Sequence, residues 1–204
     1  LFDNNVKVFS NEEALKIRKQ LGVQEDIANS LVGLGNVYLS DGQYERALYH
    51  YETALNIFRQ LNTPREIAIT LTHVGSTYQM IDHYEKALSF FEESLEISKR
   101  LNIPLLLATS LNNIAVVYSS IGKYEEALSY YEESLKLNRE LGNPHDVATN
   151  ISNIGGLYTS LGQYEKALKY LNESLKIRKE INSPREVTNS LINKGVVYLA
   201  QRKY

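Results

Sequence analysis

The sequence contains no cysteine among its 204 residues, and it has no long apolar run. The absence of cysteine excludes disulfide bonds, thiol nucleophiles and thiolate-bound metals. No apolar stretch approaches the roughly 18 to 20 residues needed to cross a bilayer, and the N-terminal segment lacks the apolar core of a signal peptide. These absences indicate a soluble protein, and we expect it to be cytoplasmic.

Acidic residues exceed basic residues only slightly, because the chain has 24 Asp and Glu and 22 Lys and Arg, and its net charge is -2. The isoelectric point is near pH 6.1. Such a chain has no bulk electrostatic field to attract a phosphate backbone or an anionic lipid surface. We therefore expect neither nucleic acid nor a membrane as a partner.

Catalytic motifs are also missing from the sequence. The four histidines are scattered without the spacing of metal ligands, and no zinc-protease motif, phosphate-binding loop or nucleophile elbow occurs. We expect a protein that is not an enzyme and that uses no metal and no cofactor.

What the sequence does contain is one unit copied at a period of 40 residues. The stretch Leu31 to Ala54 recurs at 71–94, 111–134 and 151–174, and its first part recurs from Leu191. A fixed period without insertions is typical of a repeat array. The pattern predicts a lead-in at 1–10, the second helix of a preceding repeat at 11–23, repeats at 24–63, 64–103, 104–143 and 144–183, and a partial repeat at 184–204. Because the array has already begun when the sequence starts, we expect a fragment of a larger protein.

Each unit consists of two amphipathic halves, with apolar residues spaced three and four apart from about Glu25 to Ser40 and from about Gln43 to Leu61. Thr63 and Ser183, each followed by proline and then by glutamate three residues after the hydroxyl, predict capping boxes at helix starts. Asn143 begins a near variant. Glycine in a left-handed conformation is expected to end the first helix at Gly42, Gly122 and Gly162, with Asp82 in the second copy.

Two helices joined by a tight turn cannot bury their apolar faces alone, so the units must stack. Small residues mark the expected close approaches of the helices: Gly35, Gly75, Ala115, Gly155 and Gly195 on the first helix, and Ala47, Ala87, Ala127 and Ala167 on the second. Tyrosines are expected to fill the space between in two ladders: Tyr38, Tyr78, Tyr118, Tyr158 and Tyr198, and Tyr44, Tyr84, Tyr124, Tyr164 and Tyr204.

These shared positions resemble the tetratricopeptide repeat. The resemblance rests on Leu34, Gly35, Tyr38, Gly42, Tyr44, Ala47, Tyr51 and Ala54, and it covers the chain from Asn11 onward. The 40-residue form is similar to repeats of kinesin light chains, spindle-orientation adaptors and multi-repeat bacterial and archaeal proteins. The resemblance implies an all-α fold, a right-handed α-solenoid of stacked antiparallel helix pairs, with a concave groove lined by the first helices.

The residues expected to face this groove carry no Lys, Arg, Asp or Glu in any copy. That excludes the carboxylate clamp of chaperone-binding relatives. The row His73, Asn113, Asn153 and Asn193 instead resembles the asparagine ladders with which relatives hold an extended peptide, since an amide both donates and accepts. The predicted peptide-binding residues are His73, Asn112, Asn113, Asn153, Asn193, Asn36, Ser76, Gln79, Val116 and Thr149. The alternative is that these amides bond to neighbouring helices and only support the stack.

A second irregularity is the apolar run from Ile103 to Leu107, where other copies are polar and charged. It predicts either additional packing or a sticky patch on the rim at Leu105 and Leu106.

Three functions compete on this evidence. The first is a protein interaction scaffold that binds an extended peptide or helix in an uncharged groove. The second is an architectural spacer or oligomerisation arm that self-associates through uncapped ends. The third is a peptide-sensing regulatory domain of a larger protein.

Overall fold

The computed structural model describes residues 2–202, with side chains from residue 10 onward. This part of the chain forms ten α-helices and no strand. The helices are α1 (Phe2–Leu21), α2 (Gln24–Ser40), α3 (Tyr44–Leu61), α4 (Pro64–Met80), α5 (Tyr84–Arg100), α6 (Pro104–Ser120), α7 (Tyr124–Glu140), α8 (Pro144–Ser160), α9 (Tyr164–Glu180) and α10 (Pro184–Gln201). Helix α1 therefore extends through most of the segment expected to be a lead-in.

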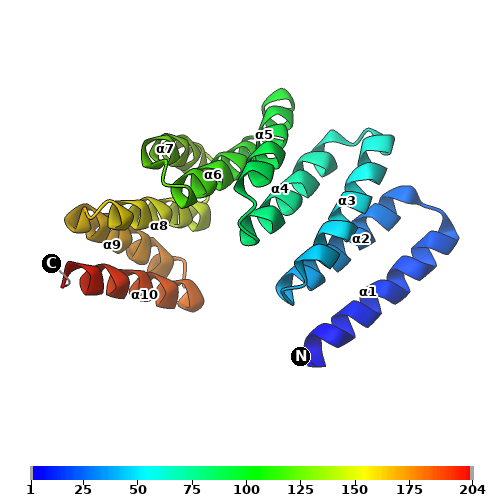
Figure 1. Cartoon of the computed structure of the whole chain (residues 1–204), viewed down its shortest axis with the longest axis horizontal. Coiled ribbons are helices and arrows are strands. Elements are labelled where there is room, and N and C mark those ends of the chain that lie inside the picture. The colour runs from blue at the N-terminus through cyan, green and yellow to red at the C-terminus, as the bar shows by residue number, and fades with distance from the viewer. Residues whose placement is uncertain (1, 203–204) are drawn as a thin grey trace. The chain divides into compact units, whose positions relative to one another are not determined.

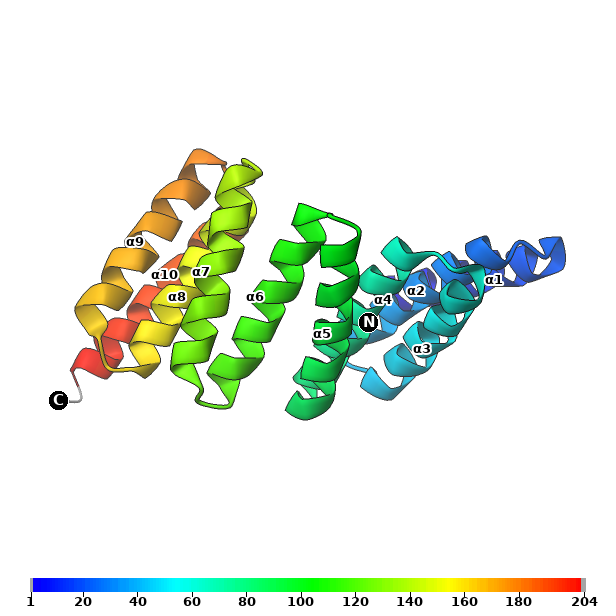
Figure 2. The same cartoon turned by 90° about the horizontal axis from the view of Figure 1, so that it is seen from above.

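The chain divides into two compact units, unit 1 (Leu1–Asn102) and unit 2 (Ile103–Tyr204). Within unit 1 each helix packs on the next from α1 to α5, and within unit 2 the same holds from α6 to α10 (Figure 1). The second view shows the same helices turned by 90° (Figure 2). This tandem arrangement of helix pairs confirms the predicted all-α solenoid fold.

The turns within each pair use the expected left-handed residue. Gly42, Gly122 and Gly162 have φ of 73°, 79° and 70°, and Asp82 has φ of 59° at the same position. Their amide groups close the last turn of the first helix, as in the 3.1 Å bond from Gly42 N to Leu39 O. The chain can therefore reverse within three residues and lay the second helix against the first.

The predicted capping boxes are wrong at two of the three positions. Neither Thr63 nor Ser183 makes a side-chain cap bond, whereas Asn143 Oδ1 accepts from Asp146 N at 3.3 Å. Thr63 Oγ1 instead donates to the Phe58 carbonyl. Glu186 forms ion pairs with Arg178 and His145, and so its carboxylate is engaged elsewhere. Proline in the first turn is present at all these helix starts and stabilises them without a cap.

Close approach of the helices explains the small residues on both of them. The alanines Ala47, Ala87, Ala127 and Ala167 are fully buried. A Cβ added at Gly75 would lie 2.7 Å from Cε1 of Phe91, and one added at Gly35 would overlap the Tyr51 ring. At Gly195, by contrast, no atom lies within 4 Å of such a Cβ. The packing glycines of unit 1 therefore make room for an aromatic ring of the second helix.

The tyrosine ladders are not the buried aromatic row. Of the first ladder only Tyr38 is buried, and Tyr198 is 50% exposed. Its other members pack on second-helix rings, with ring centres 5.4 to 5.5 Å apart for Tyr78–Phe90, Tyr118–Tyr130 and Tyr158–Tyr170. The second ladder is half-buried at the starts of the second helices, and Tyr204 lies outside the described residues. Apart from Tyr38, the buried aromatic side chains of the described residues are Tyr51, Phe58, Phe91 and Tyr131, all on second helices.

Candidate functional site

The first-helix face of a unit is the side lined by the first helices of its pairs, α2 and α4 in unit 1 and α6, α8 and α10 in unit 2. Serines of the second helices form hydrogen bonds with the backbone of the first helices. Ser94, Ser134 and Ser174 each donate to the carbonyl oxygen of the alanine 26 residues earlier, at 2.9, 2.7 and 2.7 Å. These bonds are buried and equivalent in three copies, so they fix the first helices on which the candidate site lies.

In unit 1 the predicted site residues converge on Tyr51. The Tyr51 hydroxyl donates to Asn36 Oδ1 at 2.7 Å, and the His73 ring stacks on the Tyr51 ring with centroids 5.2 Å apart. Burial raises the pKa of Tyr51 to about 12 and lowers the pKa of His73. The phenol therefore remains a donor at physiological pH, and its bond to Asn36 engages the amide oxygen that was expected to hold a peptide.

In unit 2 a chain of hydrogen bonds leads from the core to the first-helix face, and the donor and the acceptor of each of these bonds can be assigned. Ser134 Oγ donates to the Ala108 carbonyl at 2.7 Å, which uses the only hydroxyl proton. The same oxygen can then only accept from Asn150 Nδ2, 3.0 Å away. Asn150 is 1% exposed, and its Oδ1 accepts from Asn138 Nδ2 at 2.7 Å. The amide of Asn150 therefore has one allowed orientation.

Asn150 in turn orients Asn112 and Asn153. Its Nδ2 donates to Asn112 Oδ1 at 3.1 Å, and Asn153 Nδ2 donates to the same oxygen at 3.0 Å. Asn153 thus directs its nitrogen into the network. Its Oδ1 accepts no hydrogen bond from the residues that the structure describes, and this oxygen is available on the first-helix face.

A groove of about 390 Å³ lies on this face of unit 2, where Asn153 and two other predicted residues meet. It is lined by Val116, Ser119, Tyr131, Ser152, Asn153, Gly156, Leu157, Thr159, Ser160, Leu171, Asn193 and Val196. All of these side chains are uncharged. Asn193 Nδ2 donates to Ser152 Oγ at 3.4 Å, which links α10 to α8. The groove can therefore offer hydrogen bonds and apolar contacts to a neutral ligand, but no counter-charge.

The other predicted site residues lie outside this groove. Asn112 is within the network, with its nitrogen 3.5 Å from Asn113 Oδ1, and Thr149 Oγ1 donates to the His145 carbonyl of its own helix. Ser76 and Gln79 are half-buried on α4 of unit 1. On the proposed rim patch Leu105 is 47% exposed and Leu106 is half-buried. The row His73, Asn113, Asn153 and Asn193 thus has one member in unit 1 and three in unit 2.

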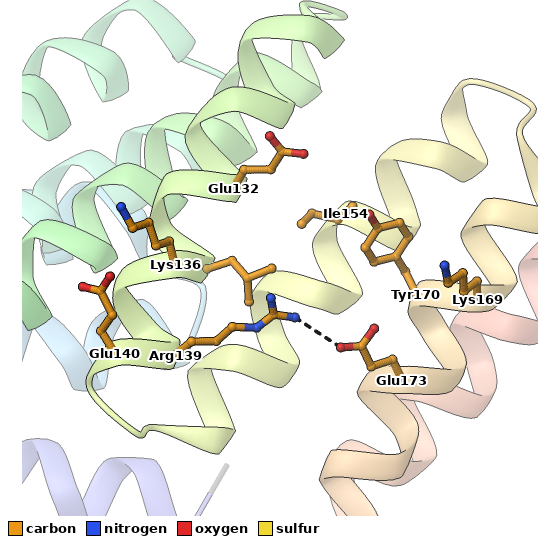
Figure 3. Close-up of a pocket in the computed structure, with 9 residues that line it drawn as sticks. Glu132, Lys136, Arg139, Glu140, Ile154, Lys169, Tyr170 and Glu173 are labelled. Atoms are coloured by element: carbon orange, nitrogen blue, oxygen red, sulfur yellow. Dashed lines mark hydrogen bonds and ion pairs between the residues drawn. The ribbon is translucent and has the colours of Figure 1, made fainter.

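The opposite side of unit 2, lined by the second helices α7 and α9, has a different character. A crevice of about 460 Å³ there is lined by seven residues that are charged or aromatic and by two aliphatic residues. Arg139 of α7 and Glu173 of α9 extend toward one another across it and pair at 3.3 Å (Figure 3). Arg59 and Glu93 form the equivalent pair in unit 1 at 2.7 Å. These exposed pairs link successive second helices. In unit 2 the charged side chains of the crevice thus lie opposite the uncharged groove.

Sequence reasoning did not single out two residues of this site, Tyr131 and Asn150. Tyr131 was counted with neither tyrosine ladder. A signal for Asn150 was present, because the other copies have Ser30, Thr70, Ser110 and Ser190 at its position. Gly156 was expected on the groove face, and the structure shows that it lines the same groove as Tyr131.

Two further features concern the residues that the structure describes. They contain no group of three or more His, Asp or Glu side chains that could hold a metal ion. No helix among them has the length and apolar character needed to cross a membrane.

Comparison with solved structures shows the same fold. BtubC (BKLC) from P. vanneervenii is 23% identical, with a TM-score of 0.82 over 97% of this chain and 84% of its own. A Rap protein complexed with competence and sporulation factor is 18% identical, with a TM-score of 0.81 over 98% of this chain. This chain spans 59% of that Rap protein. TPR-like repeats of a putative kinesin light chain from Podosopora anserina are 16% identical, with a TM-score of 0.68 and 86% of each chain covered.

No curated protein matches the sequence significantly. The family model described as tetratricopeptide repeat matches residues 26–100, 106–180 and 146–204. The matched segments extend over most of the chain and through both units. The chain therefore belongs to the tetratricopeptide repeat family.

Proposed function

We propose that this chain is an interaction scaffold that binds an uncharged, extended peptide segment of another protein in the groove of unit 2. The observation that supports the proposal is the Asn153 amide, whose nitrogen donates to Asn112 while its oxygen faces an uncharged groove. An extended peptide presents an N–H group to such an acceptor, and carbonyl oxygens to the second N–H of the Asn193 amide. The complex of the Rap protein with competence and sporulation factor shows that a chain of this fold occurs with a bound partner.

The test is selection of a displayed library of random 12-residue peptides against the whole chain, followed by titration of the enriched peptides. Replacing Asn153 and Asn193 together by alanine should weaken their binding by about 5- to 100-fold, because each lost hydrogen bond is worth about 0.5 to 1.5 kcal/mol. The matched control is Arg139→Ala on the second-helix side, which should leave both affinity and helical content unchanged. Recovery of no peptide, or equal affinity for the double variant, would show the proposal to be wrong.

A second candidate function is self-association, favoured by the apolar side of α10. Leu191, Ile192 and Leu199 are 52%, 58% and 66% exposed there. Exposed apolar side chains on one helix face are typical of a surface that packs against a further helix. Light scattering after size exclusion tests this candidate, since a spacer of this kind should form dimers or larger species that Leu191→Glu with Leu199→Glu returns to monomers.

A further inference from the structure

Equivalent tyrosines of the two units differ in whether their hydroxyl has a partner. Tyr51 donates to Asn36, which lies 15 residues earlier in the same repeat. Tyr131 is in the position of Tyr51, but the residue 15 before it is Val116, which cannot accept a hydrogen bond. Among the residues that the structure describes, none accepts from the Tyr131 hydroxyl, although Tyr131 is only 3% exposed.

A second difference lies at the position that faces the ring in unit 1. A Cβ at Gly35 would overlap the Tyr51 ring, whereas the equivalent residue of unit 2 is Ala115, which has a Cβ. The Tyr131 side chain is one of the residues that line the groove of unit 2.

Gly156 lines the same groove as Tyr131 and adds no side chain to it. No atom lies within 4 Å of a Cβ placed on Gly156, so the space over this residue is free. Burial raises the pKa of Tyr131 well above its ordinary value, and the hydroxyl therefore stays protonated at any physiological pH. The result is a donor without an acceptor among the described residues, on a groove that a ligand can enter and where a ligand can supply the acceptor.

Two groups of the groove now define the chemistry of a ligand. Tyr131 Oη needs an acceptor, and Asn153 Oδ1 needs a donor because its own nitrogen donates to Asn112. A neutral group that carries both a carbonyl oxygen and an NH₂ satisfies the two together. A carboxylate or ammonium group would have to lose its hydration without meeting a counter-charge, because the lining residues are all uncharged.

We propose that the groove contains a subsite for a carboxamide side chain, Asn or Gln, of the bound peptide, with Tyr131 Oη donating to its oxygen and Asn153 Oδ1 accepting from its nitrogen. This inference rests on the proposed function, because it specifies which peptides the groove prefers. It makes Tyr131 and Gly156 determinants of specificity, and it predicts one position in the ligand at which Asn or Gln is selected.

The experiment uses the same displayed library on the whole chain and on three variants. Wild type should enrich Asn or Gln at one peptide position, and Tyr131→Phe should lose that enrichment. Val116→Asn supplies the acceptor that Asn36 provides in unit 1, and it should also lose the enrichment by engaging the hydroxyl internally. Tyr51→Phe is the matched control in unit 1 and should select the same peptides as wild type.

An enriched peptide then gives a quantitative test. Replacing its Gln by Met should weaken binding to wild type by about 5- to 100-fold, which corresponds to the two lost hydrogen bonds with Tyr131 and Asn153, and should weaken binding to Tyr131→Phe less, because only the bond with Asn153 is lost there. Replacing Gln by Glu should weaken binding further at neutral pH. Circular dichroism and an unfolding curve establish that Tyr131→Phe is folded.

The remaining outcomes overturn the subsite in distinguishable ways. If peptides are enriched and depend on Asn153 and Asn193, but Gln→Met costs the same in wild type and Tyr131→Phe, the subsite is wrong and the proposed function stands. If Tyr131→Phe weakens all peptides equally whatever their side chains, the hydroxyl binds backbone and the carboxamide preference is wrong. If no peptide is enriched at all, both proposals fall together.

Discussion

Unit 1 and unit 2 use the same repeat to build two different first-helix faces. In unit 1 Tyr51 donates to Asn36 and is stacked by His73, so the polar groups are engaged by one another. In unit 2 Tyr131 and Val116 line the same groove, and the space over Gly156 is open. The hydroxyl of Tyr131 and the amide oxygen of Asn153 keep hydrogen-bonding capacity that the described residues do not use. The comparison shows that a closed site and an open one can differ by single residues at positions that do not alter the stack.

The difference extends into the core behind the face. The position that is Asn150 in unit 2 is Thr70 in unit 1, where the hydroxyl only donates to a carbonyl of its own helix. Asn150 contacts both Asn138 and Asn112, and so it connects α7, α8 and α6. The buried Asn138 Oδ1 keeps no partner. Unit 2 therefore carries a buried polar network with one unpaired acceptor, which costs stability, and the same network orients the amides at the surface.

The largest expected effect tests the close helix approach in unit 1. Gly35→Val places a branched side chain where the Tyr51 ring lies, and overpacking of this kind costs about 3 kcal/mol of unfolding free energy. The matched control is Gly195→Val on α10, which meets no atom near its Cβ and should cost nothing. Urea unfolding followed by circular dichroism measures both, and an equal loss in the two variants would contradict the packing account.

The next effect tests the network of unit 2. Asn150→Ala leaves the buried Asn138 amide without its acceptor and should cost about 2 kcal/mol of unfolding free energy. It should also weaken peptide binding, although Asn150 touches no ligand, because the Asn153 amide becomes free to turn. Asn150→Ser introduces the residue type of the equivalent positions Ser30, Ser110 and Ser190. It retains a polar group and should lose less unfolding free energy and less peptide affinity than Asn150→Ala.

Binding separates this positioning role from a purely structural one. If Asn150→Ala lowers stability but leaves the affinity for enriched peptides unchanged at a temperature where the variant is folded, the network does not orient the groove. Thr70→Ala is the corresponding change in unit 1 and should leave peptide affinity unchanged.

The fold was largely predictable from the sequence because the repeat makes the same demands in every copy. Gly42 and Asp82 could be assigned to left-handed turns, and Ala47 to a close helix contact, from their position alone. The cap at Thr63 was wrong because its hydroxyl donates to the Phe58 carbonyl, and at the Ser183 helix start Glu186 forms ion pairs with Arg178 and His145, which lie on other helices. Sequence spacing describes interactions along one helix, whereas these ion pairs depend on how helices pack.

The candidate site was predictable only in outline. Asn153, Asn193 and Val116 were expected on one face and all line the groove, since periodicity decides which side of a helix a residue occupies. Whether an amide is free or engaged depends on neighbours 15 to 41 residues away, such as Asn36 for Tyr51 and Asn112 for Asn153. No pattern within one helix contains that information, and the subsite at Tyr131 could therefore not be derived from it.

A smaller effect compares the two hydroxyls directly. Tyr51→Phe removes a bond to Asn36 and should lower the unfolding free energy by about 0.5 to 1.5 kcal/mol. Tyr131→Phe removes a hydroxyl without a partner, and it should leave stability unchanged or slightly raised. Thermal unfolding of the two variants decides the matter, and a clear loss for Tyr131→Phe would mean that its hydroxyl is bonded in the free protein.

The smallest effect depends on pH and has opposite signs in the two units. The hydrogen bond to Asp146 raises the pKa of His145 against an opposing effect of burial, with Glu186 adding to the rise. Its stabilisation of unit 2 is therefore full below the ordinary value of about 6.5 and is lost as the pH rises through the raised pKa. Burial lowers the pKa of His73, so its contribution to unit 1 is present above about 6.5 and is lost as the pH falls.

Two variants separate these contributions, each measured against wild type by urea unfolding at about pH 5.5 and 7.5, on either side of the ordinary histidine pKa. His145→Gln should be the more destabilising at the lower pH, by less than about 1 kcal/mol, since the pair with Asp146 and Glu186 is exposed. His73→Asn introduces the residue of the equivalent positions Asn113 and Asn153, and relative to wild type it should gain stability at the lower pH. If both variants change in the same direction between the two pH values, the histidines are not in the opposite environments that distinguish the units.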